Sequence, residues 1–210
     1  MKEDILRERL SVNSKAKKGN RQKATCILMR TWVTVPARAA GLRNRALELL
    51  ARCSEDQRLI LHWGLCMVAY PFFMLVAGTT GRLLRLQGAL AQSQVLSRVW
   101  RQIGQRPTVT RATQRVLRSF VDWGVLADAS ERGVYKLGPV RSVADPALTA
   151  WLVEATMMAA NETHAPLNAL RRNPALFPFS LDALTAGVLS RQARLEVYRQ
   201  ALDEEMVALR

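Results

Sequence analysis

The sequence predicts a mainly α-helical bundle with one small β-hairpin. Two observations support this prediction. Apolar residues recur at helical spacing through much of the 210 residues, most clearly from Ala112 to Val121. Two short apolar runs, 125–127 and 134–137, flank a polar segment that ends at Gly133, and this pattern is typical of a β-hairpin.

The first 56 residues are expected to form a basic, helical N-terminal segment. Apolar periodicity predicts helices over about 2–12, 21–35 and 37–52, with Pro36 between the last two. The region around the loop 13–20 is rich in cations and resembles a phosphate-contacting arm, although a solvated loop explains it equally well. The cations in question are Lys15, Lys17, Lys18, Arg21 and Lys23.

Residues 57–138 are expected to form a helical core. Ser54 and Gln57 have the spacing of a capping box and should begin its first helix. The run from Leu59 to Gly81 then has no charged residue over 23 positions, which is long enough to span a bilayer. Pro71 divides this run, so we favour two core helices that meet at Pro71 over a membrane span.

A pair of helices is expected to follow. Residues 82–104 continue the helical pattern, and their last part, about 93–103, should be the first helix of the pair. Pro107 and Thr108 should close a loop, Thr110 should cap the second helix, and Gly124 should lie at the left-handed end of that helix. One half of this second helix is apolar (Ala112, Thr113, Val116, Leu117, Phe120, Val121), and the other is polar (Arg111, Gln114, Arg115, Arg118, Asp122).

This polar helix and the hairpin after it resemble the second half of a winged helix-turn-helix. In that family the helix enters the major groove and the hairpin touches the backbone, so the resemblance implies binding to double-stranded DNA. Arginine can pair with guanine and glutamine with adenine. A solvated basic helix beside a packing hairpin would give the same pattern, and some winged-helix domains bind proteins. The expected contacts, besides the N-terminal cations, are Arg111, Gln114, Arg115, Arg118, Arg132, Lys136, Arg98 and Arg101.

Residues 139–210 are expected to form a helical C-terminal segment. Asp145 or Pro146 should begin a helix that continues to Asn161, and Ser180 should cap another over about 181–190. A last helix is expected over about 191–209. One side of that helix would present Leu195, Tyr198, Leu202, Met206 and Leu209, either to the core or to a homodimer seam.

The charge is uneven along the chain. The net charge is +14, but residues 122–210 are slightly acidic, and residues 57–121 contain nine arginines and no acidic residue. A long stretch of one sign of charge favours a polyanionic partner, and we expect nucleic acid.

No catalytic motif is present, and we expect neither enzymatic activity nor a metal or cofactor. The nearest cluster, Glu154, Glu162 and His164, is expected to be polar surface. The three cysteines lack the spacing of a disulfide framework or zinc site, which fits a reducing cytoplasm and core packing.

The order of these features is similar to the BrxA family of bacteriophage-exclusion (BREX) systems. The similar motifs are Ile5-Leu6, Asn13-Ser14-Lys15, Ser54-Glu-Asp-Gln57, Trp100 before Thr110-Arg-Ala-Thr-Gln-Arg, and Phe120-Val-Asp-Trp-Gly124. The resemblance implies a mainly helical protein with a winged-helix portion that binds double-stranded DNA, without known catalysis, beside other anti-phage defence proteins. The alternatives are an adaptor that assembles such a complex through its C-terminal helices, and a winged-helix transcription regulator.

Overall fold

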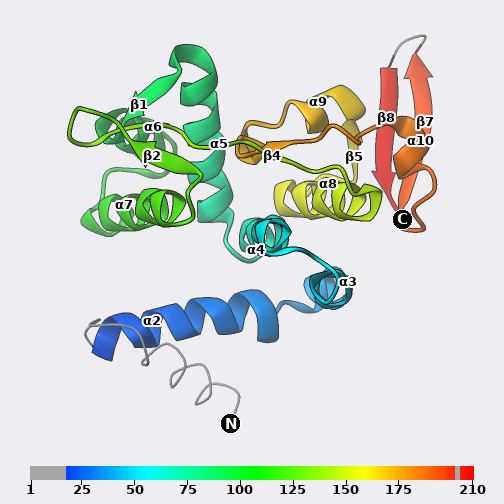
Figure 1. Ribbon diagram of the computed structural model, residues 1–210, viewed down its shortest axis with the longest axis horizontal. Coiled ribbons are helices and arrows are strands. Elements are labelled where there is room, and N and C mark those ends of the chain that lie inside the picture. The colour runs from blue at the N-terminus through cyan, green and yellow to red at the C-terminus, as the bar shows by residue number, and fades with distance from the viewer. Residues whose placement is uncertain (1–17, 202–203) are drawn as a thin grey trace.

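The computed structural model describes residues 18–201 and 204–210 of the chain. The helix expected over 2–12 lies outside the described residues. Figure 1 shows a mainly helical protein in which α5 (Pro71–Gln87) stands between two groups of elements. One group contains α6 (Gln92–Ile103), α7 (Pro107–Asp122) and a small sheet. The other contains α8 (Pro146–Ala160), α9 (Leu167–Arg171) and a terminal hairpin.

The N-terminal elements follow the predicted boundaries closely. Helix α2 (Lys18–Leu28) runs into a π-helical turn, η1 (Met29–Val33), before Pro36. A 3-10 turn, η2 (Ala37–Ala39), then leads into α3 (Ala40–Leu50). The helices expected over 21–35 and 37–52 are therefore confirmed. Ile27, one of the apolar residues at helical spacing in this segment, is 47% exposed, and α2 runs along the lower edge of the molecule (Figure 1).

The uncharged run forms two helices that meet at Pro71, as favoured from the sequence. Helix α4 (Glu55–Ala69) begins at Ser54, whose N–H donates to Gln57 Oε1 at 3.1 Å, and α5 (Pro71–Gln87) begins with the proline. The two helices are bent by 118° relative to each other. Among the described residues, no single helix has the length and apolarity to cross a membrane. Taken together, α4 and α5 reach the required length and apolarity, but by length and composition only, and the pair is bent.

The continuous helix expected over 82–104 is wrong. Helix α5 ends at Gly88, which has φ 72°, a left-handed conformation that stops an α-helix. A three-residue strand, β1 (Ala89–Ala91), follows, and α6 (Gln92–Ile103) begins after it. The strand was missed because three residues are too few to show an alternating pattern.

Helix α7 and the hairpin match their predictions, apart from the cap. Helix α7 (Pro107–Asp122) begins with a proline after Arg106, so Thr110 lies inside the helix and is not its cap. Proline favours this first position because its fixed φ suits the helix and its missing N–H would have had no partner there. Gly124 has φ 67°, as expected for the end of the helix.

The hairpin belongs to a three-stranded antiparallel sheet in the order β1-β3-β2. Strand β2 (Leu126–Asp128) and strand β3 (Val134–Leu137) form the predicted hairpin, and β1 pairs with the other edge of β3.

The C-terminal part contains more strands than expected. Asp145 Oδ1 accepts hydrogen bonds from two N–H groups of the first turn of α8 (Pro146–Ala160), as predicted. The other elements are β4 (Arg141–Ser142), β5 (His164–Pro166), α9 (Leu167–Arg171), η3 (Pro174–Leu176), β6 (Phe179–Ser180), α10 (Ala186–Leu189), β7 (Leu195–Ala201) and β8 (Glu204–Leu209).

Both helices expected after residue 180 are wrong. Ser180 belongs to β6, which pairs in parallel with β4, and only the short α10 is helical between 181 and 190. The segment expected as the last helix forms β7 and β8, which pair with β5 in the order β5-β8-β7. Val197 faces Val207 across this hairpin, and strand pairing of such β-branched residues overrode the helical spacing. The expectation of a single hairpin is therefore also wrong.

A buried aromatic cluster joins α4, α5 and α7. Trp63 of α4 is fully buried, and its ring centroid lies 4.8 Å from that of Phe120 and 4.9 Å from that of Phe73. Its Nε1 donates to Ala175 O at 3.0 Å, and its ring also meets Phe177. This cluster fixes the apolar side of α7 on the core, so its polar side is held in one orientation.

Candidate nucleic-acid interface

The two sides of α7 divide as the sequence predicted. Thr113, Leu117 and Phe120 are buried against the core. The polar residues expected on the other side are all exposed: Arg111, Gln114, Arg115, Arg118 and Asp122. From Arg111 to Arg118 the helix rises about 10 Å, which is close to three base-pair steps of duplex DNA.

These exposed side chains are mostly without protein partners. Arg118 Nε lies 2.9 Å from Asp122 Oδ1, in an ion pair whose side chains are 68% and 54% exposed. Such an exposed pair contributes little stability, so the guanidinium can exchange its partner. The side chains of Arg111, Gln114 and Arg115 make no hydrogen bond or ion pair with any residue that the structure describes. Their donors are free to meet a ligand.

The hairpin of residues 126–137, called the wing here after its expected role, holds its two expected cations in different positions. Arg132 is exposed in the turn, beside Gly133, which has φ 77°. Lys136 lies on the central strand, paired with Ala89 on one side and Ala127 on the other. Directly paired residues share a face of a sheet, so Lys136 extends from a face of small residues. In Figure 1 the wing turn and α7 lie at the same end of the molecule.

Tyr135 anchors the wing to α6. Its hydroxyl lies 3.3 Å from Gln92 Oε1 and donates to it. Burial, and secondarily the nearby Asp128 carboxylate, raises the pKa of Tyr135 above its usual value, so the hydroxyl stays protonated as a donor. The Asp128 carboxylate adds a negative charge to the wing. The surface around Arg132 and Lys136 is therefore not uniformly basic.

A second basic region lies between α5 and α6. Arg82, Arg98 and Arg101 line a hollow of about 200 Å³ together with Thr79 and Gln102. Arg98 and Arg101 also border a neighbouring hollow of about 410 Å³, which Ser93, Gln94 and Ser97 help to line. Among the residues that the structure describes, no carboxylate lines either hollow. Arg98 and Arg101 were expected contacts, whereas Arg82 was not, because it comes from the preceding helix.

All nine arginines of residues 57–121 have exposed side chains. Arg85 donates to Arg172 O, and Arg106 donates to Ile103 O. With no acidic residue in this stretch, the positive field of these arginines is offset only by carboxylates from other parts of the chain.

The N-terminal cations are not brought to α7 by the described structure. Lys23 is exposed on α2, which runs as a separate element below α7 (Figure 1). Lys15 and Lys17 lie outside the described residues, and so do the side chains of Lys18 and Arg21.

Two expectations about other polar side chains are wrong. Glu154 was expected at the surface but is only 4% exposed, because Arg45 Nη2 donates to both of its carboxylate oxygens at 2.6 Å. Glu162 and His164 are exposed, as expected. Cys66 is buried and Cys53 is half-buried, but Cys26 is exposed rather than packed in the core.

No family model, curated protein or solved structure matches this chain. The similarity to the BrxA family therefore stays an expectation from the order of short motifs.

Proposed function

We propose that this protein binds double-stranded DNA through the polar side of α7, as a non-catalytic component of a larger system. The proposal rests chiefly on the exposed row Arg111, Gln114 and Arg115, whose donors have no partner in the described structure. The buried cluster around Trp63 supports it, because a recognition helix must keep one fixed orientation on its domain.

The surroundings of α7 support a winged helix-turn-helix interpretation. Helices α6 and α7 are joined by the three residues 104–106, and Gly104 has φ 89°. A three- or four-residue turn that contains glycine is typical of this motif. The sheet β1-β3-β2 contacts both helices of the pair and would serve as a wing. In this interpretation α7 enters the major groove, which is about 12 Å wide.

The remaining cations supply contacts to the phosphate backbone. Arg98 and Arg101 belong to the helix that would cross the backbone, and Arg132 and Lys136 belong to the wing. If about six phosphates are neutralised, affinity should fall about 10³-fold between roughly 50 and 200 mM salt. Phosphate contacts set register, whereas Arg115 or Gln114 would contact base edges.

The setting in an anti-phage defence system is part of the proposal and rests on the motif order that resembles the BrxA family. A transcription regulator with the same fold would prefer one operator strongly, whereas a general component of such a system would tolerate most sequences.

The test is fluorescence anisotropy of the purified protein with a random duplex of about 30 base pairs at several salt concentrations. The double variant Arg111→Ala, Arg115→Ala should bind at least tenfold more weakly, since each side chain is expected to contribute roughly 1–3 kcal/mol if it contacts a base. The matched control removes the same charge from the C-terminal part, as Arg191→Ala, Arg199→Ala. Equal losses in both variants, or affinity that does not depend on salt, would contradict the proposal.

A further inference from the structure

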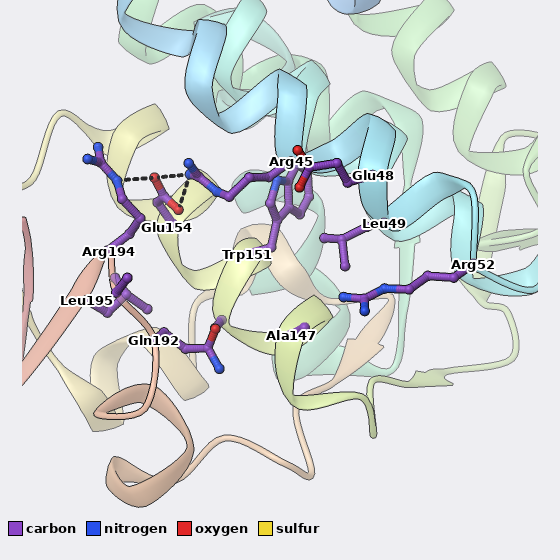
Figure 2. Close-up of a pocket in the computed structure, with 12 residues that line it drawn as sticks. Arg45, Glu48, Leu49, Arg52, Ala147, Trp151, Glu154, Gln192, Arg194 and Leu195 are labelled. Atoms are coloured by element: carbon purple, nitrogen blue, oxygen red, sulfur yellow. Dashed lines mark hydrogen bonds and ion pairs between the residues drawn. The ribbon is translucent and has the colours of Figure 1, made fainter.

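A separate pocket lies on the other side of the molecule from the candidate interface, between α3, α8 and the segment before β7. It has a volume of about 340 Å³, which is at the small end of the range for pockets that hold small molecules. Figure 2 shows that side chains from all three elements point into it. Neither the fold nor the proposed DNA binding requires a hollow here.

The floor of this pocket is apolar and rigid. Trp151 is 3% exposed, and its Nε1 donates to Leu42 O at 3.0 Å, which fixes the indole in place. Its ring lies directly against Gly64 of α4, where a methyl group would overlap the ring. Leu49 and Leu195 complete a buried apolar surface beside it. A fixed apolar floor favours a ligand with a compact apolar body.

The charged side chains at the rim of the pocket have a net charge of +1. Arg45, Arg52 and Arg194 line it, against two carboxylates, Glu48 and Glu154. Glu154 is already bound by Arg45, and Arg194 Nε lies 3.7 Å from it. Within the described residues, the side chain of Arg52 makes no hydrogen bond or ion pair.

The guanidinium of Arg52, which has no partner in the described structure, lies at the edge of the pocket. In Figure 2 the guanidinium extends from the turn after α3 over Ala147, and the Gln192 side chain extends from the opposite side. The guanidinium fork matches a carboxylate or a phosphate, and a pocket wall lowers the local dielectric constant and strengthens such a contact. An anionic group between Arg52 and Gln192 would place an attached ring on the floor beside Trp151.

We propose that this pocket binds a small organic anion, in which a carboxylate or phosphate group is held by Arg52 and a single apolar ring rests beside Trp151 and Leu49. This site is independent of the DNA-binding proposal. Because it joins α3 to the terminal hairpin, an occupied pocket stabilises the contact between the N-terminal and C-terminal parts of the chain.

The test uses ligand-observed NMR with two probes, benzoate and phenyl phosphate, and with benzamide as the neutral counterpart. At least one anion should bind with a dissociation constant that is roughly millimolar, as expected for a ligand of this size. Binding by benzoate alone identifies a carboxylate site, by phenyl phosphate alone a phosphate site, and by both a general anion site. Equal binding of benzamide, or no binding of either anion at about ten times that concentration, would overturn the proposal.

Two variants and a control locate the site. Arg52→Gln should weaken anion binding about tenfold or more, since it removes a charged hydrogen bond, and Ala147→Leu should weaken it by filling the pocket. Arg52 is exposed without a partner, so its replacement should leave the unfolding temperature unchanged. Arg58→Gln, on α4 outside the pocket, is the matched control. Anion binding that is unchanged by Arg52→Gln or by Ala147→Leu would place the anion elsewhere and overturn the proposal.

Discussion

His62 makes the stability of this protein depend on pH in a defined direction. Its Nδ1 accepts a hydrogen bond from Trp32 Nε1 at 2.9 Å, and its ring stacks on Trp32 and meets the edge of Trp123. Its other nitrogen lies 3.6 Å from Cys66 Sγ. Burial lowers the pKa of His62 from 6.5 to about 4, because the charged imidazolium would lose its hydration there.

The unfolded chain therefore binds a proton at His62 more readily than the folded protein. The stabilisation by neutral His62 is complete above pH 6.5 and is lost as the pH falls from 6.5 towards the folded pKa of about 4. Between about pH 7.5 and pH 5 the free energy of unfolding should fall by about 2 kcal/mol from this group alone, and by about 3 kcal/mol once the pH is below 4.

Urea unfolding at these two pH values measures this loss. The chain has only one other histidine, His164, which is exposed, so His164→Gln is the matched control and should keep the full pH dependence. His62→Gln should lose about 2 kcal/mol of that dependence, whatever its stability at neutral pH. Equal pH dependence in wild type and His62→Gln, or an NMR titration of folded His62 near pH 6.5, would refute the argument.

Two further predictions concern packing. Gly81→Ala should destabilise the protein by about 3 kcal/mol or more, since the new methyl group would overlap Pro174 O, whereas Gly187→Ala, with open space around it, should change stability by less than about 0.5 kcal/mol in thermal unfolding. Arg45→Met should lower the free energy of unfolding by roughly 2–4 kcal/mol, because it leaves the buried Glu154 carboxylate without this partner. Adding Glu154→Gln should recover most of this loss in a double-mutant cycle, and additive effects of the two substitutions would argue against the pair.

The sequence predicted α7 well because one signal decided both its structure and its candidate role. The apolar and polar residues of that helix separate at a period of 3.6, and no strand pattern competes with it. The start of the helix was missed by four positions, since Thr110 resembled the cap while Arg106 is the residue that precedes the helix. Helix ends depend on single residues, so they are harder to predict than helix faces.

The terminal hairpin shows where sequence patterns are ambiguous. Leu195, Tyr198 and Leu209 fit a helical stripe, but Leu195 and Val197 also alternate with polar residues as a strand does. The outcome depended on the pairing of β8 with β5, whose residues lie about forty positions earlier in the chain.

Both sites outside α7 bring together residues that are far apart in the sequence. Arg82 lines the same hollow as Arg98 and Arg101 only because the chain turns back at Gly88 into β1 and α6. Arg45 and Glu154 are 109 positions apart, and nothing local to Glu154 distinguishes it from a surface carboxylate. Such contacts follow from tertiary packing, which local periodicity does not specify.

The most direct test of the central proposal is a site-specific crosslink from α7 to DNA. A photoreactive benzoylphenylalanine replaces Gln114, which is exposed and has no partner among the described residues, and in a matched control it replaces Ser190, which is also exposed. After irradiation at low salt with a labelled duplex, we expect a crosslink from position 114 and none from position 190. A crosslink from position 190 alone, or none from position 114 under conditions where the protein binds the duplex, would contradict the placement of α7 in the DNA groove.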